Sequence, residues 1–248
     1  MTENWITEAS DPDHLILAWQ APDEFRDRTR FAVGMLTCVE GVVRLRYFGD
    51  SEEFRRFNPG KSYAQMVTYG YSGYPGFASD SVEHSTGVIE AFMRRLPPRS
   101  RPDFAAYEQH LRVRPGTELS DFALLGLSEA YLPSDGFSVV DPLDLTEDQR
   151  QLVVELAGYR YYSSKVEGPL PSVGDKVEIV AEDDNAFDPR AVAVTFRGQK
   201  IGNINRLQVE TFREWAAQGR IEAAVDRLNG RADRPRLFLF VRVAPQKR

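Results

Sequence analysis

Three apolar runs in the first 50 residues of the chain predict strands. Residues 14–20, 31–38 and 42–48 form three runs rich in Val, Leu, Ile and aromatic side chains. Runs of this composition are typical of β-strands, and the third run partly alternates, as a half-buried strand does. Glu40 and Gly41 lie between the second and third runs, where we expect a hairpin turn.

Helical spacing follows these strands. Residues 82–96 place Val88, Ile89 and Phe92 on one helical face, and the prolines at 97 and 98 end that helix. We predict a second helix over 103–112 and a third after Ser120, whose hydroxyl suits an N-cap. A small sheet followed by several helices predicts an α+β domain.

Residues 69–77 form a stretch of glycines and aromatic residues without the lysine of a phosphate-binding loop. We expect a structured loop whose rings pack on the domain, with a partner-binding loop as the alternative.

The second half of the chain has the pattern of a small barrel. Strands are predicted over 152–162 with a bend at Gly158, and over 176–181, 191–196, 200–203, 221–228 and 236–243. One amphipathic helix is predicted over 207–218. Short strands at this density predict an OB- or SH3-like antiparallel β-barrel with one or two helices. The predicted fold class is therefore α+β, with one domain at 1–148 and a barrel domain at 149–248, joined by a linker near Pro142.

Composition narrows the functional classes. Hydrophobic residues make up 42% and charged residues 27% of the chain, as in ordinary folded proteins. No apolar run is long enough to cross a bilayer, and the first residues lack a signal-peptide pattern, so we expect a cytoplasmic protein without a membrane partner. The net charge is −10 over 1–148 and +4 over 149–248. This asymmetry suggests different roles for the two halves, although +4 is too small to establish nucleic-acid binding.

Metal and catalytic chemistry are not expected. The single cysteine, Cys38, cannot form an internal disulfide or a cysteine zinc site. The three histidines are scattered, and the aspartates at 183, 184 and 188 lack the glycine and terminal glutamate of a calcium loop. No nucleophile–base pair stands out, so we expect a non-enzyme without cofactor or metal, although catalytic groups distant in sequence can meet in space.

Three short segments carry the candidate chemistry of the second half. They are Tyr159-Arg160-Tyr161-Tyr162, Asn185-Ala186-Phe187-Asp188-Pro189-Arg190-Ala191-Val192, and Lys200-Ile201-Gly202 before the predicted helix. With the Gly174-Asp175 turn, they resemble the HIRAN domain family over nearly all of 150–243. The resemblance implies an OB-like barrel that, in some fork-remodelling helicases, holds the 3′ end of single-stranded DNA.

The resemblance also implies roles for individual residues. Tyr161 and Phe187 would stack terminal bases, Asp188 would accept a hydrogen bond from the 3′ hydroxyl, and Arg160 would contact a phosphate. Tyr162 completes the Arg-Tyr-Tyr of the DNA-binding members, Arg206 takes the place of a phosphate-binding lysine, and Asn203 stands where the family has a histidine. The candidate nucleic-acid-binding residues are Arg160, Tyr161, Tyr162, Phe187, Asp188, Asn203 and Arg206.

Physical chemistry supports this set and also offers simpler alternatives. A base on an aromatic ring gains about 1–3 kcal/mol without reading sequence, and arginine makes charge-assisted bonds to phosphate. However, side chains alternate across a strand, so Tyr161 or Tyr162 can belong to the core. Asp188 can serve only to shape its turn, and Arg206 can be a solvated residue at a helix start.

Some residues depart from the family pattern. Phe187 has no hydroxyl, Asn203 is uncharged and the loop around them is acidic. These departures weaken the expected affinity for phosphate.

The first half is similar to the N-terminal lobe of HipA-type toxin kinases, through its early strands, the residues at 99–104 and Phe122-Ala123-Leu124-Leu125. In that family the lobe makes protein contacts, and no segment here supplies the kinase core. The sequence therefore predicts a non-catalytic protein that binds single-stranded DNA or DNA 3′ ends and has a protein-interaction lobe. The alternative is a protein-interaction or antitoxin-like regulator whose barrel is only a scaffold.

Overall fold

The computed structural model describes residues 4–9, 11–22, 24–25, 30–81, 83–132, 134–143, 149–186 and 188–245. The chain forms two compact units. The N-terminal unit comprises Ala9–Tyr107 and Glu118–Pro142, and the C-terminal unit comprises Met1–Glu8, Glu108–Thr117 and Leu143–Arg248. Relative to the predicted division at 148/149, three short segments of the first half thus belong to the C-terminal unit, at 1–8, 108–117 and 143–148.

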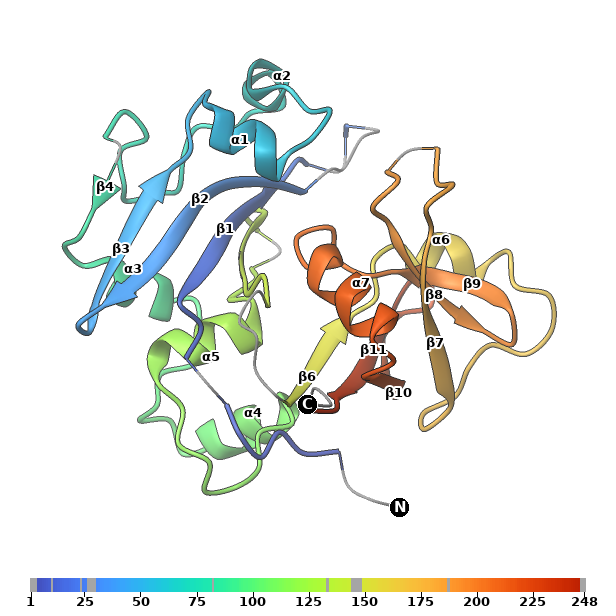
Figure 1. Ribbon diagram of the computed structural model, residues 1–248. Helices are drawn as coiled ribbons and strands as arrows, with labels where there is room; N and C mark the ends of the chain where they lie inside the picture. The colour runs from blue at the N-terminus through green and yellow to red at the C-terminus, as the bar shows by residue number, and fades with distance from the viewer. Residues whose placement is uncertain are drawn as a thin grey trace. The chain divides into compact units, whose positions relative to one another are not determined.

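The N-terminal unit is built on a five-stranded antiparallel sheet in the order β4-β3-β2-β1-β5 (Figure 1). The three predicted strands at its centre are confirmed. Glu40 and Gly41, at φ of 51° and 77°, make the expected turn between β2 and β3. The strands are β1 (His14–Gln20), β2 (Arg30–Val39), β3 (Val42–Tyr47), β4 (Glu83–His84) and β5 (Phe137–Val140).

Among the described residues, the helices of this unit are α1 (Glu52–Phe57), α2 (Tyr63–Thr68), α3 (Val88–Met93) and α5 (Asp121–Ser128). The helix α4 (Phe104–His110) has its first four residues in this unit and its last three in the C-terminal unit. Ser120 caps α5 as predicted, because its Oγ accepts a hydrogen bond from the Ala123 N–H at 2.9 Å. The helix predicted over 82–96 is shorter, because β4 pairs with β3 and α3 begins only after Gly87, which is left-handed at φ 68°. The sequence pattern did not indicate α1, α2 or β5.

The glycine- and aromatic-rich stretch at 69–77 is a packed loop, as expected. Tyr71 and Tyr74 are each only 6% exposed. The Tyr47 hydroxyl donates to the Phe77 carbonyl at 3.1 Å and accepts from the Tyr74 N–H at 3.0 Å. Burial raises the pKa of this hydroxyl, which keeps the donor protonated.

The C-terminal unit is a half-barrel made from one six-stranded antiparallel sheet in the order β6-β11-β10-β7-β8-β9. This confirms the predicted α+β class and its barrel-like second half. The strands are β6 (Arg150–Glu155), β7 (Lys176–Ala181), β8 (Val192–Phe196), β9 (Gln199–Asn203), β10 (Ile221–Arg231) and β11 (Arg234–Val243), and the helices are α6 (Tyr159–Ser163) and α7 (Val209–Ala217).

The inner face of this sheet holds the core. Leu237, Leu239 and Val241 alternate along β11 and are fully buried, as the two-residue period of a strand requires. The helix α7 packs against β7 and β8 and adds Phe212 and Trp215 to the same core (Figure 1).

The residues at 4–6 and 110–113 pair with each other and contact β10 and β11 within the same unit. Ile6 forms a parallel bridge with Val113, and the Arg242 guanidinium donates to Asn4 Oδ1 at 2.7 Å. The Arg227 guanidinium donates to the His110 carbonyl at 2.6 Å. The half-barrel therefore includes segments that are distant from it in sequence.

A buried ion pair fastens one of these segments. The ladder between β10 and β11 shifts register between Val225 and Arg227, which makes Asp226 the extra residue of a bulge. The Asp226 side chain is 0% exposed, and its Oδ1 accepts from the Arg112 Nε at 2.8 Å. Its Oδ2 lies 3.5 Å from the Arg227 guanidinium. Burial lowers the pKa of Arg227, and the Asp226 charge opposes that shift.

We expect Asp226→Asn to destabilise the C-terminal unit by about 2–4 kcal/mol, because it removes the charge that pairs with Arg112 and Arg227. Hydrogen exchange of β10 and β11 in the full chain at increasing urea measures this loss. Asp233→Asn is the control, because its pair with Arg231 is exposed at 63% and 84%, and its effect should stay within about 0.5 kcal/mol. Equal stability of the two variants would contradict the assigned role of Asp226.

Candidate nucleic-acid interface

The Tyr-rich segment after β6 is a helical turn, so the strand predicted over 152–162 is wrong beyond Glu155. Gly158 adopts φ 73°, a left-handed conformation that ends the extended run. Its carbonyl then accepts from the Tyr161 and Tyr162 N–H groups at 2.9 and 3.1 Å, which forms α6. Tyr159 is only 4% exposed and anchors the turn in the core.

A close backbone contact holds this turn beside β9. Ala157 and Asn203 exchange two N–H to carbonyl hydrogen bonds of 2.8 Å each. A Cβ at Gly202 would lie 2.5 Å from Leu156 Cγ and 2.9 Å from the Ala157 oxygen. Only glycine lets β9 approach Leu156 and Ala157 this closely. This is the physical reason for the glycine in the Lys-Ile-Gly segment.

The two tyrosines of α6 differ in their availability. Tyr161 is 58% exposed, whereas Tyr162 is half-buried and its ring lies against Gly158, where an added Cβ would be 3.2 Å from Cε2. The two rings meet edge to face, with centroids 5.0 Å apart and an interplanar angle of 85°. Tyr161 therefore presents ring surface to solvent, and Tyr162 supports it.

A lysine ammonium group lies over each of these two rings. Lys165 Nζ lies 3.8 Å from the Tyr161 ring centroid and also contacts the Tyr161 hydroxyl. Lys200 Nζ lies 4.7 Å from the Tyr162 ring centroid. Contacts of this kind combine cation–π attraction with positive charge, so the turn presents rings and cations together.

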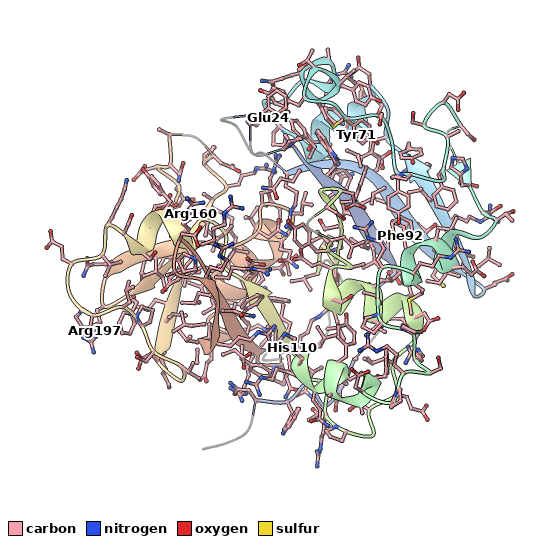
Figure 2. All side chains as sticks on the ribbon, turned by 180° about the vertical axis from the view of Figure 1, so that it is seen from behind. Glu24, Tyr71, Phe92, His110, Arg160 and Arg197 are labelled. Atoms are coloured by element: carbon pink, nitrogen blue, oxygen red, sulfur yellow. The ribbon has the colours of Figure 1, made fainter. Side chains whose placement is uncertain are left out.

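Arg160 is exposed on α6, where Figure 2 labels it. Among the described residues, neither Arg160 nor Lys165 forms an ion pair with a carboxylate. Their charges are therefore available to an anion in solution.

Neighbouring cations hold the acidic loop, residues 182–188. The Glu182 carboxylate accepts from Lys200 Nζ at 2.5 Å, and Asp183 pairs with Arg213 of α7. Arg190, just after the loop, bonds to Glu210 of α7 at 3.2 Å. These pairs offset much of the negative charge that the sequence places here.

Asp188 shapes the turn before β8. Its Oδ1 accepts from the Arg190 N–H at 3.0 Å, and its own N–H donates to Asn185 Oδ1 at 3.1 Å. These bonds correspond to the alternative given in the sequence analysis, in which Asp188 shapes its turn. The carboxylate keeps 34% exposure, and no described residue donates a hydrogen bond to its Oδ2. Turn formation thus leaves one oxygen able to accept a bond.

Of the remaining candidate residues, only Asn203 is shown to lie beside the tyrosines. Asn203 joins the tyrosines, because its amide nitrogen lies 4.0 Å from the Cβ position of Gly158, and its buried Oδ1 has no hydrogen-bond partner in the described part of the chain. Arg206 is half-buried just before α7. Phe187 lies outside the described residues, so its predicted stacking role stays a prediction.

The structure therefore brings Tyr161, Tyr162 and Asn203 together, with Arg160 on the same helical turn. It also adds Lys165 and Lys200, which were not among the predicted site residues. Lys165 could have been found from its spacing, because residues four apart meet on a helical turn. The contact of Lys200 with the Tyr162 ring depends on the pairing of β9, so the sequence could not have predicted it.

Metal and membrane features are not found in the part of the chain that the structure describes. No cluster of three or more His, Cys, Asp or Glu side chains there is arranged to hold a metal ion. No described helix is both long enough and apolar enough to span a bilayer.

A half-barrel with one exposed ring and nearby cations beside one end of its sheet defines a small β-module with a candidate polyanion site. The family model of the HIRAN domain matches residues 149–242, and this segment of the chain is a HIRAN domain. The match does not reach the N-terminal unit, whose resemblance to HipA-type lobes stays a prediction.

Two solved structures are similar to part of this chain. The HIRAN domain of human HLTF aligns at 16% identity and a TM-score of 0.30, over 38% of this chain and 76% of that one. A protein from Lactobacillus plantarum aligns at 23% identity and a TM-score of 0.29, over 38% of this chain and 96% of that one. No curated protein matches the chain.

We expect Gly202→Ala to destabilise the C-terminal unit by about 1–3 kcal/mol, the usual cost of overpacking. Leu156→Ala removes two of the three nearest atoms that the new Cβ would meet. The double variant should therefore lose less free energy of unfolding than the two single variants lose together. Urea denaturation measures these losses. Strict additivity would contradict the steric role of Gly202.

Proposed function

We propose that this protein is a non-catalytic nucleic-acid-binding protein whose HIRAN domain holds single-stranded DNA, preferentially at a free 3′ end. The main observation behind this proposal is the exposed ring of Tyr161, which packs against Tyr162 and is contacted by Lys165. An exposed ring beside cations suits a single strand, because bases stack on it without sequence readout while phosphates meet the positive charges. HIRAN domains are known to bind DNA ends, which supports the same assignment.

Asp188 supports preference for a 3′ terminus. A carboxylate repels the phosphates of an internal position, whereas a terminal hydroxyl offers it a hydrogen bond. Its Oδ1 already serves the turn, so Oδ2 is the oxygen that we assign to the 3′ hydroxyl. In this proposal, Arg160 and Arg206 contact phosphates near the terminus, and Phe187 stacks a second base.

The N-terminal unit is proposed as a protein-interaction lobe, on the strength of its resemblance alone. Co-purification of a stable partner with the full chain tests that role. Loss of an oligonucleotide substrate on incubation would contradict the non-catalytic assignment.

Replacing Tyr161 tests stacking. Tyr161→Ala should weaken binding of a short single-stranded oligonucleotide about five- to 150-fold, the equivalent of about 1–3 kcal/mol for one stacked base. Tyr161→Phe keeps the ring and is the matched control, with affinity within about twofold of the unchanged protein. Fluorescence anisotropy at low salt measures both. An equal loss in the two variants would assign the effect to the hydroxyl and its contact with Lys165.

The 3′ preference has its own test. Oligonucleotides that differ only in a 3′ hydroxyl or a 3′ phosphate should bind with affinities that differ by about tenfold or more, because the phosphate removes the donor and adds charge beside Asp188. Asp188→Asn keeps the Oδ1 acceptor of the turn but loses the charge, so it should narrow this difference. Equal affinity of the unchanged protein for both oligonucleotides would refute the role of Asp188 while leaving strand binding intact.

A further inference from the structure

One cation of the interface is already held by an anion of the same chain. Lys200 Nζ lies 2.5 Å from Glu182 Oε2, and the same oxygen accepts from the Asn185 amide at 2.9 Å. The Lys200 and Glu182 side chains keep 21% and 26% exposure. The pair therefore lies at the accessible margin of the site and is not sealed in the core.

The position of this pair puts it near a bound strand. Lys200 lies over the Tyr162 ring, and the Tyr162 ring meets that of Tyr161 edge to face. In the proposed function, a base stacked on Tyr161 would bring a phosphate of the strand toward these side chains. Lys165 provides the contrast, because it contacts Tyr161 without a described carboxylate partner.

Carboxylate and phosphate compete for the same ammonium group. Both are anions that accept charge-assisted hydrogen bonds, and Lys200 Nζ already contacts the carboxylate where it lies over the Tyr162 ring. A phosphate that approaches Lys200 is also repelled by Glu182. Strand binding therefore either forgoes this cation or displaces the carboxylate.

We propose that Glu182 is a built-in competitor for the phosphodiester backbone of single-stranded nucleic acid. It holds Lys200 in the free protein and gives it up to a phosphate when a strand binds. This inference rests on the proposed function and deepens it, because it names the cation that contacts phosphate and the carboxylate that limits affinity. The Glu182 carboxylate then keeps strand binding weak, because the contact between Lys200 and a phosphate forms only at the cost of the ion pair.

The Glu182→Gln variant isolates this competition. Glutamine keeps the size of the side chain and a carbonyl oxygen for Lys200 and Asn185, but it loses the charge. Asp184→Asn is the matched control, because it makes the same charge change in the same loop at an exposed residue that forms no ion pair with described residues. Lys200→Met removes the ammonium but keeps an apolar stem over Tyr162.

Fluorescence anisotropy with one single-stranded oligonucleotide carrying a 3′ hydroxyl, from about 50 to 200 mM salt, gives affinity and salt slope. Glu182→Gln should tighten binding about two- to tenfold, the range for releasing a partly exposed ion pair. It should also steepen the slope of log K against log salt by up to about 0.7, the value for one unit charge on a single strand, because the net positive charge that meets the strand rises by one. Asp184→Asn should change affinity by less than about twofold, and Lys200→Met should weaken it.

The double variant Glu182→Gln/Lys200→Met decides the mechanism. If Glu182 acts by holding Lys200, the gain from Glu182→Gln falls to that of Asp184→Asn once Lys200 is replaced. A gain that persists without Lys200, or equal effects of Glu182→Gln and Asp184→Asn, would overturn the competition. Absence of binding by the unchanged protein at low salt would instead refute the proposed function, and this inference with it.

Discussion

The geometry of the candidate interface depends on a single steric constraint, the absence of a side chain at Gly202. Because no Cβ fits between β9 and the segment after β6, glycine lets Ala157 and Asn203 pair through two 2.8 Å hydrogen bonds. That pairing joins the two ends of the six-stranded order, β6 and β9, and brings α6 against β9. Tyr162 then comes to lie beside Lys200 and Asn203, although the two segments are separate in sequence.

Charge pairing governs the rest of the interface. The acidic loop is held through Glu182 to β9 and through Asp183 to α7, so its negative charge is largely matched within the unit. Arg160 and Lys165 remain without described carboxylate partners. The same unit thus combines matched pairs that fix a loop with available cations beside an exposed ring, which is the combination that our proposal uses.

The sequence predicted most of the strands because each carries a local signal. Alternation and β-branched residues indicated β7 to β11, and Ser120 indicated the start of α5. It failed at α6, because three tyrosines favour a strand and only the conformation of Gly158 turns the chain. The ion pairs could not be predicted from the sequence for a different reason. Arg112 and Asp226 are 114 positions apart, and their contact depends on a bulge that no local pattern marks. The tyrosines were predicted as site residues, whereas the contact of Lys200 with the Tyr162 ring depends on the pairing of β9.

The central claim is that the exposed face of Tyr161 receives the last base of a single strand. Photocrosslinking from a halogenated pyrimidine, placed either at the 3′ terminal position or at an internal position of otherwise identical oligonucleotides, tests it directly. Peptide mapping should locate the crosslink on α6 for the terminal pyrimidine, with a much lower yield there for the internal one. Crosslinks that map away from α6, or equal yields there from both positions, would contradict the account.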